Sequence, residues 1–160
     1  RAHERVLYDE YMRTLKQERM IIQNMLHPHI FEVNPSDYAL LKEALDDFRI
    51  LGFEIEDFGK NTFAVNGIPV NMKTSDIDTR LNDILISFRE FRLNSKLAVK
   101  ESLARSLSKL NAIEYGTVLG IHEIQELIND LFSSSSPNIS PDGKKIVYII
   151  ENDDIASKLN

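Results

Sequence analysis

The fold can be predicted most directly from LGFEIEDFGKNTFAVNGIPV, residues 51–70. Apolar and polar side chains alternate around Phe53 and Ile55, and again around Phe63 and Val65. A two-residue period of this kind is typical of half-buried β-strands. The central GKN has the composition of a tight turn. The stretch therefore predicts a β-hairpin.

A helix is predicted directly before this hairpin. Asn34 is a suitable N-cap, Pro35 suits the first helical position, and Asp37 places a negative charge in the first turn. Gly52 provides a stop signal at the other end. The apolar stripe of this helix consists of Tyr38, Leu41, Leu45 and Phe48.

The rest of the chain divides by its periodicity and its turn residues. In order, the pattern predicts a helix at 4–22, an extended segment at 30–33, a helix capped by Ser75, a polar hinge at 92–96, helices up to Gly116 and at 121–132, a Ser/Pro-rich loop at 133–145, a buried strand at 146–150 and a short helix at 153–159. Strands and helices do not alternate regularly, and no glycine-rich phosphate-binding motif occurs. The fold class predicted is α+β.

Composition narrows the functional classes. With 160 residues, of which 42% are hydrophobic, the chain can form one domain with a sizeable core. The absence of cysteine excludes disulfides, thiolate nucleophiles and sulfur-ligated zinc. A net charge of -6 argues against binding of duplex DNA by this domain alone. No membrane-spanning or signal segment is recognisable, so we expect a soluble, cytoplasmic protein.

Three stretches carry a family resemblance: AHERVLYDEY (2–11), the hairpin stretch (51–70) and IHEIQELINDLFSSSSPNISPDGKKIVYII (121–150). Together they resemble the C-terminal domain of the MutL family of DNA mismatch-repair proteins, over residues 2 to about 155. The resemblance implies a homodimerising domain that a flexible linker joins to an N-terminal ATPase. It also implies a two-lobed fold, with a dimerisation subdomain (1–22 plus 96–160) and an inserted external, regulatory subdomain (23–95).

Many members of this family are metal-dependent endonucleases, and their motifs can be placed on this chain. In the first motif, DQHAxxExxxxE, Glu4 matches the first glutamate and Asp9 stands at the second. In ACxxA, Lys109 occupies the cysteine position. In CPHGRP, Ser140 replaces cysteine and Asp142 replaces histidine. Three expected ligands have therefore changed type, and we expect no metal at these positions.

Two interpretations of the substituted positions remain open. In one, Lys109 takes the place of the cation and forms an ion pair with Asp142. In the other, Glu4 and Asp142 act as catalytic carboxylates that hold Mg²⁺ or Mn²⁺ in an all-oxygen site, which hard cations accept but a neighbouring lysine opposes. Zinc is disfavoured in both.

The segment QNMLHP resembles the motif by which the family contacts the replication sliding clamp. Gln23 would bind through its amide, Met25 and Leu26 would enter an apolar pocket, and Pro28 would keep the segment extended. The alternative is that Met25 and Leu26 pack beneath the following strand.

Other polar residues have ordinary structural explanations. His27 and His29 could share one face of a strand and chelate a metal, but no third ligand is near in sequence. His3 and His122 are predicted on solvated helix faces. The basic stretch FREFRLNSK could touch DNA phosphates through Arg89, Arg92 and Lys96, but a charged helix end beside a hinge is the simpler explanation.

Three functions therefore remain: an assembly module, a divalent-metal DNA-nicking endonuclease with substituted ligands, and an unrelated α+β binding domain. The resemblance implies a second copy and the sliding clamp as partners. It implies contact with DNA and with a mismatch-recognition protein through the full-length protein, and no contact with membranes. We expect no cofactor in this domain, with ATP confined to the N-terminal ATPase, and a bacterial cytoplasmic location at the nucleoid during repair.

Overall fold

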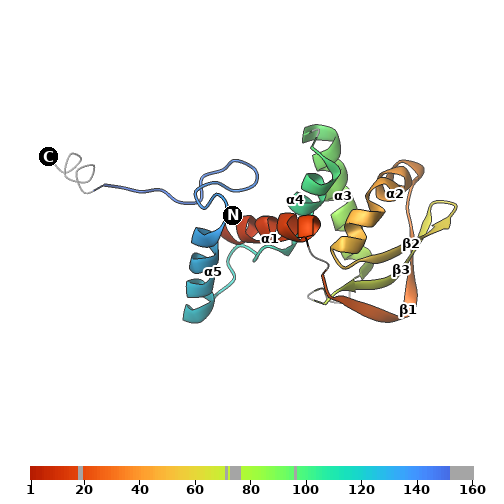
Figure 1. Ribbon diagram of the computed structural model, residues 1–160, viewed down its shortest axis with the longest axis horizontal. Coiled ribbons are helices and arrows are strands. Elements are labelled where there is room, and N and C mark those ends of the chain that lie inside the picture. The colour runs from red at the N-terminus through yellow and green to blue at the C-terminus, as the bar shows by residue number, and fades with distance from the viewer. Residues whose placement is uncertain (18–19, 71, 73–76, 96, 152–160) are drawn as a thin grey trace.

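The computed structural model describes residues 1–17, 20–70, 72, 77–95 and 97–151. The elements, in chain order, are α1 (Ala2–Gln17), β1 (Ile22–Glu32), α2 (Pro35–Ile50), β2 (Glu54–Gly59), β3 (Thr62–Pro69), α3 (Ile77–Ser95), α4 (Val99–Asn111) and α5 (Ile121–Ser133). The sheet lies at one end of the molecule and α5 at the other, with α1, α3 and α4 between them (Figure 1). The α+β class is confirmed.

The predicted hairpin is formed by β2 and β3, which pair in antiparallel fashion with Gly59 opposite Thr62. Lys60 and Asn61 both have positive φ, 51° and 62°. Left-handed residues at both central positions match the right-handed twist of the flanking strands. β1 pairs with the other side of β3, so the strand order is β1-β3-β2 and β1 is an edge strand.

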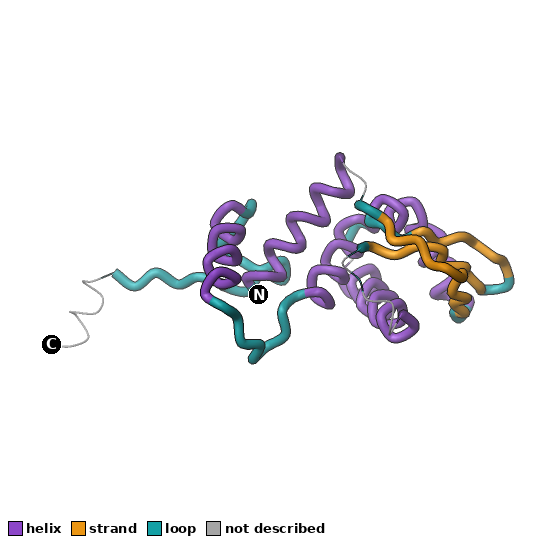
Figure 2. Tube along the Cα trace, turned by 90° about the horizontal axis from the view of Figure 1, so that it is seen from below, coloured by secondary structure: helices purple, strands orange, loops and turns teal. Residues whose placement is uncertain are grey.

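The N-terminus of α2 is capped as predicted. The Asn34 side chain accepts a hydrogen bond from the backbone N–H of Asp37 at 2.9 Å and donates one to its carboxylate at 2.7 Å. Arg89 of α3 lies 3.2 Å from the same carboxylate. At the end of α2, Phe48 packs edge-on against Phe53 and Phe88. This aromatic cluster joins the end of α2 to the start of the hairpin and to α3. Figure 2 shows the strands at one end of the molecule, next to helices.

α4 is the central helix of the other half, where it packs against α1 and α3. Its buried residues include the small side chains Ser102 and Ser106, each 0% exposed, which allow neighbouring helices to approach closely. Leu103 of α4 and Leu15 of α1 belong to the same hydrophobic cluster as Phe48. The core is therefore continuous from the sheet to α1.

Some predicted boundaries are wrong. The first helix ends at Gln17, and Ile22 begins β1. The predicted hinge at 92–96 is helical up to Ser95. Arg92 anchors this end of α3, since it donates hydrogen bonds to the Leu97 carbonyl and to Glu43. The predicted cap at Ser75, residue 96 and the short helix at 153–159 lie outside the described residues. The subdomain boundaries stay a prediction.

The prediction of a buried strand at 146–150 is also wrong. This segment forms no strand, and Tyr148, Ile149 and Ile150 are 74%, 72% and 58% exposed. It leads away from the body of the molecule (Figure 1). A strand requires a neighbour for its backbone hydrogen bonds, and no strand of the described chain lies beside this one. An isolated bridge between Ile139 and Lys145 precedes it.

Candidate functional site

The substituted metal-site positions come together where α1, α4 and the loop after α5 meet. Glu4 is half-buried on the first turn of α1. Burial raises its pKa, and the negative charge of Asp142 raises it further, while Lys109 and Lys144 act in the opposite direction. The fold therefore brings Glu4, Asp142 and Lys109 into one electrostatic neighbourhood, from three segments that are distant in sequence.

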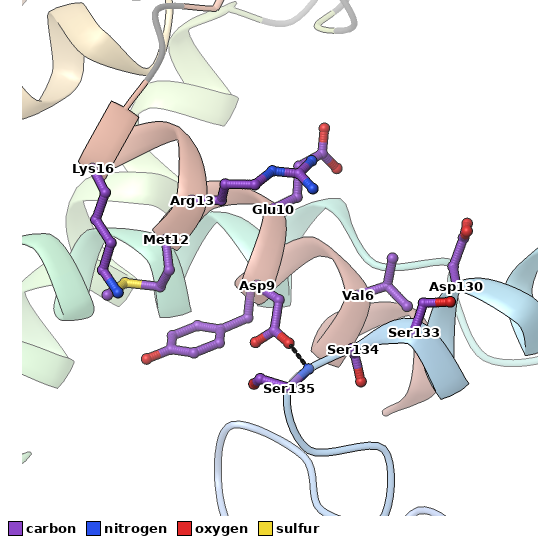
Figure 3. Close-up of a pocket in the computed structure, with 11 residues that line it drawn as sticks. Val6, Asp9, Glu10, Met12, Arg13, Lys16, Asp130, Ser133, Ser134 and Ser135 are labelled. Carbon is purple, nitrogen blue, oxygen red and sulfur yellow. Dashed lines mark hydrogen bonds between the residues drawn. The ribbon is translucent and has the colours of Figure 1, made fainter.

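Asp9 lies five residues further along α1, and the protein engages both of its carboxylate oxygens. One carboxylate oxygen accepts a hydrogen bond from Arg5 Nη1 at 3.1 Å, and the other accepts one from the backbone N–H of Ser135 at 2.6 Å. Figure 3 shows this second contact at the edge of a surface hollow of about 770 Å³. The hollow is lined by side chains of α1 and by residues at the end of α5. Both oxygens of Asp9 are thus used to join α1 to the loop.

Ser140 is buried, 1% exposed, and organises a turn. Its hydroxyl oxygen accepts a hydrogen bond from the backbone N–H of Lys144 at 3.1 Å, and its carbonyl accepts one from Gly143. Gly143 has a φ of 78°, a conformation that favours glycine. At this position serine has a backbone-organising role.

The predicted ion pair between Lys109 and Asp142 is not formed. The ammonium of Lys109 lies 5.8 Å from the centre of the Phe91 ring, and the carboxylate of Asp142 lies 3.6 Å from Arg105 Nη1. Arg105 also pairs with Glu101 at 3.1 Å, one helical turn earlier. The planar guanidinium reaches two carboxylates at once, which a single ammonium does less well.

A divalent metal does not fit this arrangement. Of the carboxylates at the family positions, Asp9 and Asp142 already face guanidinium groups, and Glu4 has ammonium groups nearby. Within the described ranges, no three histidine or acidic side chains converge as metal ligands. A metal ion would have to displace or overcome the charges of Arg5, Arg105 and Lys109.

Arg5 and Arg105 are the residues that sequence reasoning missed at this site. Each is four residues from an acidic partner on its own helix, Arg5 before Asp9 and Arg105 after Glu101. This i,i+4 spacing was a usable signal in the sequence. The contacts of these two arginines with the loop could not be predicted from the sequence, because Asp142 and Ile139 lie far away along the chain.

The segment proposed to bind a clamp lies in the edge strand β1. Asn24 pairs with Gly67 and His29 pairs with Val65, so the residues between them bulge out of register with β3. Leu26 is 90% exposed, whereas Met25 is half-buried and packs against the core. Gln23 and Pro28 are exposed. The structure thus separates the apolar pair, with Leu26 outward and Met25 inward.

The histidines are explained by local contacts. His29 Nε2 lies 2.7 Å from a carboxylate oxygen of Asp78, and His27 is exposed. His3 is half-buried, contrary to the prediction, and its Nδ1 accepts a hydrogen bond from the backbone N–H of Ile113 at 2.9 Å. Burial lowers the pKa of His3. His122 is exposed, as predicted.

The fold and this site define an α+β domain in which a polar loop is held against two helices and apolar side chains face solvent. The sequence profile of the family described as "MutL C terminal dimerisation domain" matches residues 1–119. The chain therefore belongs to this family.

Full-length relatives give the same assignment. The DNA mismatch repair protein MutL of Parabacteroides distasonis is 32% identical over 155 residues, which is 97% of this chain and 25% of the relative. The proteins of the same name from Phocaeicola vulgatus and Chlorobium phaeobacteroides are each 34% identical, over 97% and 96% of this chain and 25% of each relative. The chain spans about a quarter of the length of these relatives. None of its described helices has the length and apolarity that a membrane span needs.

Proposed function

We propose that this chain is the homodimerisation module of a DNA mismatch-repair MutL protein and brings two ATPase arms together. The observation that carries the proposal is an apolar face on α5 that no other described segment of the chain covers. Its members are partly or largely exposed and recur at helical intervals: Ile121 (64%), Ile124 (39%), Ile128 (48%) and Phe132 (60%). A stripe of this kind at one end of a folded domain is typical of a surface that another protein covers.

The segment after the loop supports the same proposal. Tyr148, Ile149 and Ile150 are exposed in the single chain, next in sequence to a loop that is well ordered by hydrogen bonds. Contact with a second copy of the chain would remove both surfaces, residues 148–150 and the apolar face of α5, from water. Most soluble oligomers are symmetric homo-oligomers, and in the commonest of them, the two-fold dimer, the same surface patch of each copy forms the interface.

The test compares two isoleucines of equal exposure. Ile128 on α5 is 48% exposed and Ile86 on α3 is 47% exposed. We expect Ile128→Asp to weaken dimerisation by about tenfold or more, because a carboxylate would be placed in an apolar contact, and Ile86→Asp to leave it unchanged. Sedimentation velocity across a dilution series measures this. A monomeric wild-type chain, or equal effects of the two variants, would overturn the proposal.

A second candidate function, docking of the replication sliding clamp, is supported by the bulge in β1. An extended, edge-located segment with an outward Leu26 can be bound by an apolar pocket. We expect Leu26→Ala and Gln23→Ala to abolish binding to purified bacterial clamp in a fluorescence anisotropy titration. Ile30→Ala is the control, since Ile30 is 50% exposed on the same strand. Equal binding by Leu26→Ala and wild type would exclude this docking mode.

We further propose that the domain takes no metal of its own and that nicking, if the parent protein nicks DNA, does not depend on Glu4. The alternative is an endonuclease built on Glu4 and Asp142 with Mg²⁺ or Mn²⁺. A nicking assay on supercoiled plasmid with Mn²⁺ distinguishes the two: activity in the full-length protein that Glu4→Ala removes would establish the alternative. Equal activity of wild type and Glu4→Ala would exclude it.

The remaining partners belong to the same proposal. ATP would bind in the N-terminal ATPase, and DNA and the mismatch-recognition protein would be contacted through the full-length protein. The bacterial origin of the relatives supports action in the cytoplasm, at the nucleoid during repair.

A further inference from the structure

Residues 134–145, which we call the polar loop, have a fixed conformation with little apolar burial to hold it. Ser140 and Pro141 are buried, whereas Asp142, Gly143 and the two lysines after them are exposed. Hydrogen bonds inside the loop, such as Ser140 N–H to the Lys144 carbonyl at 2.8 Å, close the turn on itself. They do not attach it to the body of the molecule, so other contacts must do so.

Arg5 of α1 makes the first attachment. Its side chain is desolvated, since the residue is 8% exposed. Its Nε donates a hydrogen bond to the carbonyl of Ile139 at 2.8 Å, and its Nη1 donates one to Asp9. The other oxygen of Asp9 accepts the N–H of Ser135 (Figure 3). One ion pair on α1 thus binds the beginning and the middle of the polar loop.

Arg105 of α4 makes the second attachment, through Asp142 near the end of the loop. Glu101 orients the guanidinium from the preceding turn of α4. The ring of Tyr8 lies between the two arginines, 5.3 Å from the Arg5 guanidinium and 5.8 Å from that of Arg105. Three carboxylates, those of Asp9, Glu101 and Asp142, therefore face two guanidinium groups. Both guanidinium groups lie near the ring of Tyr8, an arrangement that favours arginine over lysine.

We propose that Arg5 and Arg105 form a metal-free ionic staple that fixes the polar loop to α1 and α4. The staple engages two of the positions at which the resemblance places family metal-site residues, Asp9 and Asp142. It also sets the direction in which residues 146–150 leave the loop, and so positions them for the second copy. This last consequence rests on the proposed homodimerisation, whereas the attachment of the loop does not.

The staple is tested by hydrogen exchange of the backbone amides in residues 134–145, measured on the 160-residue chain. In wild type we expect the same protection in excess EDTA and in added Mn²⁺. In Arg5→Gln we expect a roughly 10- to 100-fold loss of protection in the loop, because charge-assisted bonds from a buried group are lost. Arg13→Gln is the matched control on the exposed side of α1, with no change expected.

Arg105→Gln provides a second variant in case Arg5→Gln does not fold, because the Arg105 side chain is less completely buried (20% exposed). We expect it to release the end of the loop near Asp142 more than its beginning near Ser135. Circular dichroism confirms that helices are retained. Loop protection that falls in EDTA or rises in Mn²⁺ would overturn the staple, and so would unchanged protection in both variants.

The dimer dissociation constant is measured in parallel for wild type, Arg105→Gln and Arg13→Gln. A weaker dimer in Arg105→Gln alone supports the positioning role of the staple. An unchanged dissociation constant despite a released loop would overturn that role. If wild type fails to dimerise at all, the proposed function fails, while the exchange data still decide whether the staple exists.

Discussion

The side chain of Asn111, at the end of α4, donates a hydrogen bond of 2.8 Å to the hydroxyl of Tyr11 in the middle of α1. Tyr11 is 3% exposed, and burial raises the pKa of its hydroxyl. The two residues are 100 positions apart in sequence. The bond therefore fixes the register in which α1 packs along α4.

Removal of this hydroxyl should destabilise the domain. We expect Tyr11→Phe to lower the free energy of unfolding by about 1–2 kcal/mol, because the Asn111 amide loses its partner while the aromatic ring stays packed. Urea denaturation followed by circular dichroism measures the change. The double variant with Asn111→Ala should cost little more than either single variant, and fully additive effects would contradict the pairing.

Ser102 of α4 offers a test of close packing. It is 0% exposed, and its hydroxyl lacks a hydrogen-bond partner within the described part of the chain. We expect Ser102→Ala to be neutral or to raise the free energy of unfolding by up to about 1 kcal/mol, since an unsatisfied polar group is removed. Ser102→Leu should lower it by about 1–3 kcal/mol through overpacking. Thermal unfolding gives both values, and a destabilising Ser102→Ala would show that the hydroxyl has a partner.

Asp57 should make folding sensitive to acid. Hydrogen bonds from Lys42, from the Tyr38 hydroxyl and from the N–H of Gly59 lower the pKa of this carboxyl from 3.8 to about 2. Because the folded pKa is the lower one, the contribution to stability is present above pH 3.8 and is lost as the pH falls towards 2. The carboxyl carbon of Asp57, followed by NMR, should titrate near pH 2.

The control for this prediction is Asp57→Asn, which removes the titrating group. Its stability should depend less on pH between about 4 and 2 than that of wild type. A midpoint for Asp57 at the usual aspartate value would show that these hydrogen bonds do not persist in solution.

The Glu4 carboxyl should affect the pH dependence of stability in the direction opposite to that of Asp57. Burial and the charge of Asp142 raise its pKa above 4.5, so the folded state binds the proton more tightly than the unfolded state does. The free energy of unfolding should therefore fall as the pH rises from 4.5 through the folded pKa of Glu4. Asp142→Asn should lower the pKa of Glu4, as NMR titration can measure. An unchanged pKa would mean that the two carboxylates are not neighbours.

Local features of the fold were predictable because their causes lie within a few residues. The Asn34 cap bonds to Asp37, three positions away, and the Lys60–Asn61 turn joins strands that are adjacent in sequence. The wrong predictions concern contacts with distant segments of the chain, which local sequence patterns do not reveal. Residues 146–150 have the composition of a buried strand but no neighbouring strand in the described chain, and composition alone does not supply one.

The candidate site also has features that the sequence predicted and features that it did not. The substitutions at Lys109, Ser140 and Asp142 were visible in the sequence. One of the two hypotheses drawn from them placed a cationic side chain, Lys109, opposite Asp142. Which cation faces Asp142 was not visible, and the choice of Lys109 was wrong. Arg105 reaches Asp142 because Glu101 and Tyr8 orient its guanidinium from the same face of the site.

Residue type and short-range spacing were enough to predict the class of fold, the hairpin, the α2 cap and the loss of the ligand types that a zinc site needs. Which charged side chains meet depends instead on the packing of the whole domain. Arg5 and Ile139 are in contact across a separation of 134 residues, and such contacts depend on how helices and loop pack around a shared core. The apolar face of α5 was likewise a periodic pattern in the sequence, and only the structure shows that the described part of the chain leaves it exposed.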